Sequence, residues 1–89
     1  MIHCQLPIIN KLGLHARAAT KLASTAGRSG CAIRTGKQEP LVDAQSVMSL
    51  MLMAASKGTM LAFEFDGEDE QEAQAAITEL LADYFGEGE

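Results

Sequence analysis

The stretch Leu61-Ala62-Phe63-Glu64-Phe65-Asp66 alternates large apolar side chains with small or acidic ones. Successive side chains of a β-strand point to opposite faces, so Leu61, Phe63 and Phe65 share one face of it. This pattern predicts a strand that is buried on one side and open to solvent on the other. A fold built on such a strand needs a second layer that covers the apolar face.

A helix after this strand supplies part of that layer. Its apolar residues recur at helical spacing and form one stripe, made of Ala73, Ala76, Ile77, Leu80, Leu81 and Tyr84. Asp69 and Glu72 have the spacing of a helix cap and its reciprocal partner. The final segment, Gly86-Glu87-Gly88-Glu89, is polar and rich in glycine, and we expect it to fray.

The N-terminal part of the chain predicts another strand and another helix. Apolar residues alternate along the first segment, at Ile2, Cys4, Leu6 and Ile8. Pro7 has no backbone donor, so it belongs at the end of that strand or at a sheet edge. Helical spacing follows between Ala16 and Ala26, and Gly27 stands where a helix can end in a left-handed cap.

The middle of the chain predicts a hairpin and a short helix. Short strands over 31–35 and 41–43 are separated by a connection that contains Gly and Pro. Ser46 can cap a helix over 47–54, which Lys57-Gly58 ends. With short links throughout, we expect an α+β fold: an open-faced β-sandwich in which three helices cover one face of a four-stranded antiparallel sheet, in the order β-α-β-β-α-β-α.

Composition narrows the function classes. The chain has 89 residues and a formal charge of −5, so we expect residues 1–89 to form one domain with no separate substrate domain. The Lys and Arg residues are scattered, which disfavours nucleic-acid binding. The chain lacks a membrane-length apolar run and the features of a signal peptide, so we expect a cytoplasmic protein. Cys4 and Cys31 lack the spacing of a metal clip, and we expect neither a metal nor a cofactor.

The segment Gly13-Leu14-His15-Ala16-Arg17-Ala18-Ala19 sets a histidine immediately before a predicted helix. The first N–H groups of a helix lack intrahelical partners and carry partial positive charge, so an anion there is stabilised. A phosphoryl group on His15 is such an anion, and the guanidinium of Arg17 can add charge-assisted hydrogen bonds to it. Gly13 has no Cβ and permits a positive φ and a close approach of the backbone to a bound group or partner. The expected cradle therefore consists of Gly13, Ala16 and Arg17.

This segment resembles the active-site segment of HPr, the histidine-containing phosphocarrier protein family. The resemblance spans essentially the whole chain and includes Gln45-Ser46-Val47-Met48, the Lys57-Gly58-Thr59 turn and the acidic segment Asp66-Gly67-Glu68-Asp69-Glu70 that leads into the last helix. It implies that His15 receives a phosphoryl group on Nδ1 from Enzyme I and passes it to a IIA-type acceptor protein. It also implies that Arg17 contacts the group and that the protein is a carrier rather than a free-standing enzyme.

One position departs from the pattern of that family. Many members have proline where this chain has Ala18. Proline presets φ for the first helical turn, but alanine is the best helix former, so we expect looser local order and unchanged chemistry.

Regulation and docking are expected at the second helix. Ser46 matches a position that an HPr kinase/phosphorylase modifies in some members, although an N-cap has its own reason to be serine. The segment 47–53 is apolar on nearly every side, whereas a helix that covers a sheet needs one buried stripe. We expect Val47, Met48 and Met51 to face outward as a docking patch for partners. A short, fully buried helix is the alternative.

Other readings stay open from the residues alone. In one, a small regulatory or ligand-binding module uses His15 only to cap a helix and binds a free anion reversibly. A metal chaperone of this size is weakened by the absence of a Cys-x-x-Cys loop. Within the resemblance, the stretch from Leu50 to Gly58 fits the nitrogen-related branch of the family as well as the sugar-transport branch. In either branch we expect a monomer.

Overall fold

The sheet is the base of the molecule. The computed structural model describes residues 1–89 and contains a four-stranded sheet in the order β1-β4-β2-β3. Every neighbouring pair is antiparallel, and the strands are β1 (Ile2–Pro7), β2 (Ala32–Gly36), β3 (Val42–Asp43) and β4 (Met60–Asp66). β4 lies in the interior of the sheet, where Phe65 is opposite Ile2 on one side and Ile33 on the other. β1 is an edge strand that ends at Pro7, as its missing donor predicted.

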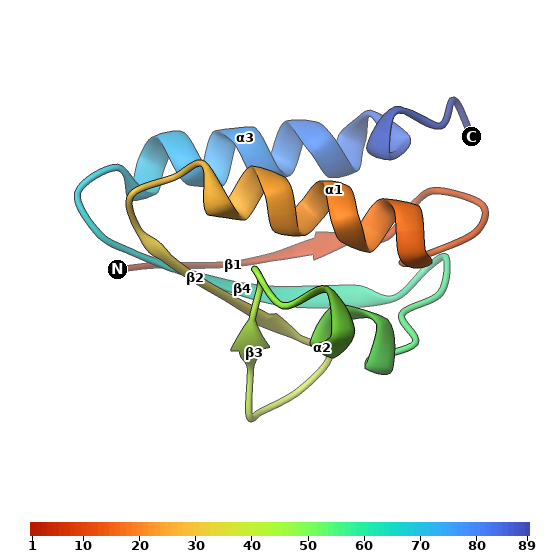
Figure 1. The fold of residues 1–89 in the computed structure, drawn as a ribbon, viewed down its shortest axis with the longest axis horizontal. Coiled ribbons are helices and arrows are strands. Elements are labelled where there is room, and N and C mark those ends of the chain that lie inside the picture. The colour runs from red at the N-terminus through yellow and green to blue at the C-terminus, as the bar shows by residue number, and fades with distance from the viewer.

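The helices form the second layer. They are α1 (Ala16–Gly27), α2 (Val47–Leu52) and α3 (Glu70–Ala82), followed by the 3-10 turn η1 (Tyr84–Gly86). α1 and α3 lie side by side across one face of the sheet, and α2 lies at the β3 end (Figure 1). The predicted open-faced sandwich and its element order are confirmed.

The core fills the space between the layers. Leu61, Phe63 and Phe65 are fully or almost fully buried, and the two phenyl rings stack with their centroids 5.9 Å apart. Burying a side chain of this size contributes about 2–3 kcal/mol. The helices meet this face with the residues Ala18, Ala19, Leu22, Ala23, Ala26, Leu50, Ala73, Ile77 and Leu81. One connected cluster of 19 buried residues results.

Two predicted helix ends differ from the structure. Gly27 is the last residue of α1 rather than its left-handed cap, because the helix closes at Arg28 in the right-handed region with φ −82°. α2 ends at Leu52 instead of Ala54, and Ala54 takes a left-handed φ of +52°. A left-handed residue reverses the chain direction, so the reversal comes before the predicted stop at Lys57-Gly58.

Asp69 precedes α3 as predicted, but it does not form the predicted reciprocal cap with Glu72. Its side chain makes no cap hydrogen bond and accepts instead from the backbone N–H of Gly30 at 2.7 Å. Glu70 accepts from the backbone N–H of Gly67 at 3.2 Å. The Asp69 carboxylate therefore binds the loop after α1 instead of capping α3. This contact joins distant parts of the chain.

The prediction that the C-terminal residues fray is wrong. Phe85 is fully buried in the core, and its carbonyl accepts from Lys21 Nζ at 2.6 Å. The backbone N–H of Lys11 donates to the carbonyl of Glu89 at 3.1 Å. We call residues 84–89 the C-terminal strap; it runs from the end of α3 toward the start of α1 (Figure 1). Burial of Phe85 and the hydrogen bonds of the strap each offset part of the cost of ordering this segment.

The turn before α1 is pinned to the turn after α2. The backbone N–H of Leu14 donates to the carbonyl of Ala55 at 2.8 Å. Gly13 has φ +71°, and a Cβ there would lie 2.6 Å from the Ala55 carbonyl oxygen and 2.9 Å from Ser56 Cα. Only glycine fits this position without moving backbone.

Gly13→Ala should therefore lower the free energy of unfolding by about 2–4 kcal/mol, since it adds a backbone clash to the cost of a positive φ. Urea unfolding followed by circular dichroism measures this. Gly58→Ala is the matched control, because Gly58 has φ +94° with open space around it and should cost only about 1 kcal/mol. Equal losses in the two variants would contradict the proposed clash.

Candidate functional site

His15 occupies the N-cap of α1, as predicted. Its backbone is extended with φ −79° and ψ −179°, and its carbonyl accepts from the N–H of Ala19 at 2.8 Å. Its ring turns back toward the helix, where Nδ1 accepts from the backbone N–H of Arg17 at 3.3 Å. The side chain keeps 27% of its surface exposed. One ring nitrogen thus faces the positive end of a helix in a position that another protein can reach.

The other expected members of the cradle contribute unequally. Ala16 is exposed, and its backbone N–H forms no hydrogen bond within the chain, so a free donor stands beside the ring. Gly13 is buried against Ala55 and Ser56, so its lack of a Cβ is explained by packing. The free amide at the start of α1 is the part of the cradle that an anion can use.

Arg17 supplies a positive charge without an internal partner beside the site. It is exposed, and its guanidinium forms neither a hydrogen bond nor an ion pair within the chain. It borders a recess of about 300 Å³ that also has Lys11 and Lys21 on its wall. A guanidinium without an internal partner is available to an anion on His15.

Glu87 is a site residue that sequence reasoning missed. Its Oε2 contacts His15 Nε2, and its Oε1 accepts from Asn10 Nδ2 at 3.0 Å. Asn10 is fully buried, and its Nδ2 also donates to the carbonyl of Gly13 at 2.8 Å. Only 10% of the Glu87 side chain is exposed. No local pattern marks this residue, because its role depends on Phe85 anchoring the strap.

The charge state of Glu87 follows from this environment. Burial raises the pKa of its carboxyl, but hydrogen bonds from Asn10 and His15 and the positive charge of Lys21 lower it by more. The pKa of Glu87 therefore lies below its ordinary value, and the group is a carboxylate at neutral pH.

The helix α2 exposes part of its apolar surface, as predicted. Met48 is 67% exposed, Met51 is 41% exposed, and Leu52, which the prediction omitted, is 77% exposed. Val47 differs from the prediction, because it is partly buried against the core next to Ser46. Val47 lies in the first turn of α2, and this turn packs against the core, so the side chain points partly inward.

Ser46 caps α2, as predicted. Its Oγ accepts from the backbone N–H of Ser49 at 3.2 Å and donates to Ser49 Oγ at 3.0 Å. The hydroxyl thus has a structural role whether or not it is ever modified.

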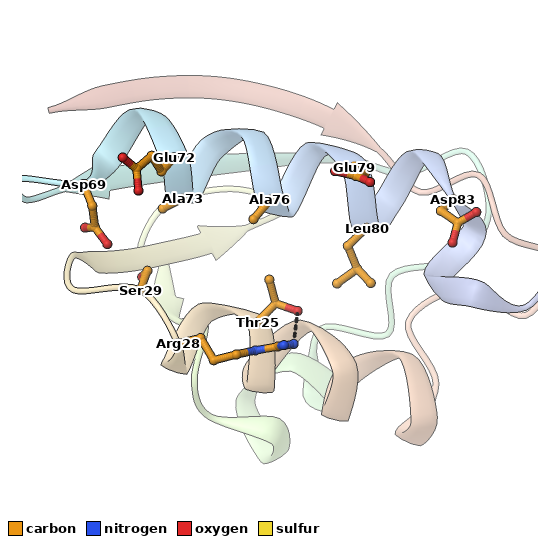
Figure 2. A pocket seen from close by; sticks show the side chains of 10 residues that line it. All are labelled: Thr25, Arg28, Ser29, Asp69, Glu72, Ala73, Ala76, Glu79, Leu80 and Asp83. Carbon is orange, nitrogen blue, oxygen red and sulfur yellow. Dashed lines mark hydrogen bonds between the residues drawn. The ribbon is translucent and has the colours of Figure 1, made fainter.

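Cavities elsewhere do not include the histidine. A cavity of about 540 Å³ lies between α1 and α3, and neither His15 nor Arg17 lines it (Figure 2). Its acidic side chains come from α3 and its ends, while Arg28 on the opposite wall donates to Thr25 Oγ1 at 3.3 Å.

No cluster of three or more His, Cys, Asp or Glu side chains could hold a metal ion. None of the helices is long and apolar enough to cross a membrane.

Comparisons with known proteins agree with this geometry. The family described as "PTS HPr component phosphorylation site" matches residues 2–83. The chain is 47% identical to the phosphocarrier protein HPr of Neisseria meningitidis serogroup A over 89 residues, which cover 100% of both chains. It is 50% identical to the phosphocarrier protein HPr of Pseudomonas aeruginosa over 86 residues, with 96% of each chain covered. The crystal structure of HPr-C-His from Thermoanaerobacter tengcongensis superposes with a TM-score of 0.92 at 36% identity and covers 98% of each chain.

These similarities define the class first: a small protein that carries a phosphoryl group and is not an enzyme in its own right. The chain belongs to the HPr family, the phosphocarrier proteins of the phosphotransferase system. Membership of this family implies protein partners of the Enzyme I and IIA types.

The ionised state of Glu87 predicts a dependence of stability on pH. A carboxyl whose pKa is lower in the folded state adds stability that is complete above its unfolded pKa, about 4.3. That stability is lost as the pH falls through the lowered folded pKa. Wild type should therefore exceed Glu87→Gln in unfolding free energy near neutral pH, and the gap should shrink below about pH 4. Urea unfolding across this range measures the gap.

The control for this experiment is Glu89→Gln. Glu89 is an exposed residue of the same strap, with Oε1 3.9 Å from Lys11 Nζ. An exposed pair of this kind contributes little, so the variant should follow wild type at every pH. A gap between wild type and Glu87→Gln that stays constant with pH would show that the charge of Glu87 plays no part.

Proposed function

We propose that residues 1–89 act as one phosphocarrier domain in which Nδ1 of His15 accepts a phosphoryl group from Enzyme I and passes it to a IIA-type protein. The domain acts as a monomer in the cytoplasm. The observation that carries this proposal is the orientation of the ring, with Nδ1 directed at the amides that begin α1.

The surroundings of Nδ1 suit the product of that transfer. A phosphoryl group on Nδ1 would meet the N–H groups of Ala16 and Arg17, which can donate to its oxygens. The Arg17 guanidinium is free to swing onto the same oxygens and to form charge-assisted hydrogen bonds. His15 has 27% of its side chain exposed, which is enough for a donor and an acceptor protein to reach it in turn.

The first test is transfer of labelled phosphate from phosphoenolpyruvate through Enzyme I. Wild type should gain an acid-labile, alkali-stable label, and His15→Ala should gain none. Arg17→Ala should slow transfer by about 10–100-fold, and Arg17→Lys by less, since a lysine keeps the charge without the planar fork. Arg28→Ala is the control, an exposed arginine just beyond the other end of α1. Label that survives in His15→Ala would place the phosphoryl group on another residue, and reversible anion binding without label would support the helix-cap alternative.

We further propose that the exposed side chains of α2 form the docking surface for Enzyme I. Met48 and Met51 are flexible apolar groups, of the kind that adapts to more than one partner. The hydrogen bond from Leu14 to Ala55 joins the His15 segment to the turn after α2, so the patch and the histidine belong to one surface. Val47 contributes at most its exposed edge, because it packs partly against the core.

Met48→Ser with Met51→Ser should therefore weaken Enzyme I binding by about tenfold, since the contact loses apolar area while the core is untouched. Titration calorimetry measures the affinity and thermal unfolding checks the fold. Met60→Ser is the control, because Met60 is an exposed methionine at the start of β4. Unchanged affinity in the double variant would remove α2 from the interface.

Regulation at Ser46 is the remaining proposal, with an HPr kinase/phosphorylase as the modifying partner. A phosphate on Ser46 Oγ would replace its hydrogen bonds with Ser49 and would place negative charge beside the docking patch. Incubation with ATP and cell extract followed by mass spectrometry should find phosphate on Ser46. Ser49→Ala serves as the control because its hydroxyl is the neighbour that Ser46 contacts. Phosphate absent from Ser46 would end this proposal.

A further inference from the structure

We propose that Glu87 is a positioning residue for phosphoryl transfer: its carboxylate holds the proton of His15 on Nε2, keeps Nδ1 free to react, and balances the charge that the ring gains. The inference rests on the proposed role of His15 and adds a residue outside the His15 segment. It stands on the contacts that surround the imidazole.

The hydrogen bonds of the ring define its tautomer. A carboxylate can only accept, so the His15 nitrogen that contacts Glu87, Nε2, must be the donor. A neutral imidazole carries a single N–H, which leaves Nδ1 with a lone pair. The backbone N–H of Arg17 donates to Nδ1 at 3.3 Å, which requires that same lone pair. Two independent contacts thus select one tautomer, and it is the one that transfer to Nδ1 needs.

The carboxylate is itself held in place. Oε1 accepts from Asn10 Nδ2 at 3.0 Å, and Asn10 is fully buried and fixed by its bond to the Gly13 carbonyl. Upstream, Phe85 anchors the strap in the core, and Lys21 Nζ binds the Phe85 carbonyl at 2.6 Å. Because the acceptor is already ordered, little entropy is lost when it orients the ring.

The carboxylate also matters to the charge of the product. In the transfer step the Nδ1 lone pair forms the N–P bond, and the bond from phosphorus to the donor breaks with its electron pair going to the donor. The proton on Nε2 does not move, so the phosphorylated ring becomes positively charged. Glu87 faces that charge through the Nε2–H group, and the phosphoryl oxygens face the helix amides on the other side. Transfer onward to the acceptor runs through the same steps in reverse.

The expected size of the effect is moderate. Residues that orient a reacting imidazole through its second nitrogen change function by about 10–100-fold when they are removed. His15 is partly exposed, which weakens the electrostatic share of the interaction. We therefore expect the lower end of that range.

The test compares wild type with Glu87→Ala and Glu87→Gln, with Glu89→Gln as the control from the same strap. In the first measurement, ¹⁵N NMR of the neutral imidazole reports which ring nitrogen carries the proton. Wild type should carry the proton on Nε2, and Glu87→Gln should do so less completely, because the single carbonyl oxygen of glutamine must serve both His15 Nε2 and Asn10 Nδ2. Glu87→Ala should show a mixture of both tautomers.

The second measurement is phosphoryl transfer from Enzyme I and phosphoenolpyruvate. Glu87→Ala should transfer about tenfold more slowly, and Glu87→Gln about threefold more slowly, because glutamine keeps one acceptor near the ring but loses the charge. Glu89→Gln should match wild type in both measurements. Amide NMR spectra verify the fold, and the isosteric Gln variant keeps the test valid if the Ala variant is disturbed.

The possible outcomes separate this inference from the proposed function. If wild type is labelled on His15 while both Glu87 variants keep the wild-type tautomer and rate, Glu87 has no positioning role. Faster transfer in the variants would also overturn the inference, since the strap would then be a brake on the site. If wild type gains no label on His15, the proposed function itself fails, and the NMR measurement still reports whether Glu87 sets the tautomer.

Discussion

Burial of Leu61, Phe63 and Phe65 on one face of β4 determines where both long helices can lie. α1 and α3 must cover this face, and they do so side by side, so the start of α1 and the end of α3 come to the same side of the molecule (Figure 1). His15 stands at the first of these points and the C-terminal strap leaves from the second. The contact between His15 and Glu87, across more than 70 residues of sequence, is thus a product of how the helices pack on the sheet.

The parts of the molecule that the sequence predicts are those governed by neighbours along the chain. Alternation predicts β1 and β4, helical spacing predicts α1 and α3, and the histidine before a helical run predicts the N-cap. Three of the failures involve distant partners. Asp69 turns to the Gly30 amide, Val47 leans on the core, and Phe85 enters the core from outside the apolar stripe. No local pattern contains these contacts, because each depends on the packed tertiary structure.

The site shows how a carrier differs from an enzyme with an enclosed active site. The Nδ1 of His15, where we propose transfer, meets a backbone donor at the start of α1, and the ring keeps part of its surface exposed. Preorganisation is concentrated in the orientation of the imidazole, which the helix amide holds on one side and the strap on the other. In the proposed relay, the remaining stabilisation of the transition state would come from groups of the partner proteins.

The hydrogen bonds between the two turns have a kinetic meaning. Gly58 donates to Ile8, Ile8 donates to Thr59, and Leu14 donates to Ala55, all at 2.7–2.8 Å, so three backbone hydrogen bonds tie the segment after α2 to the end of β1 and to the turn before α1. If partners dock on α2 beside His15 as we propose, donor and acceptor share one surface. Donor and acceptor must therefore take turns, and the flux of such a relay is limited by residence time: a grip that is too strong would slow it as surely as one that is too weak.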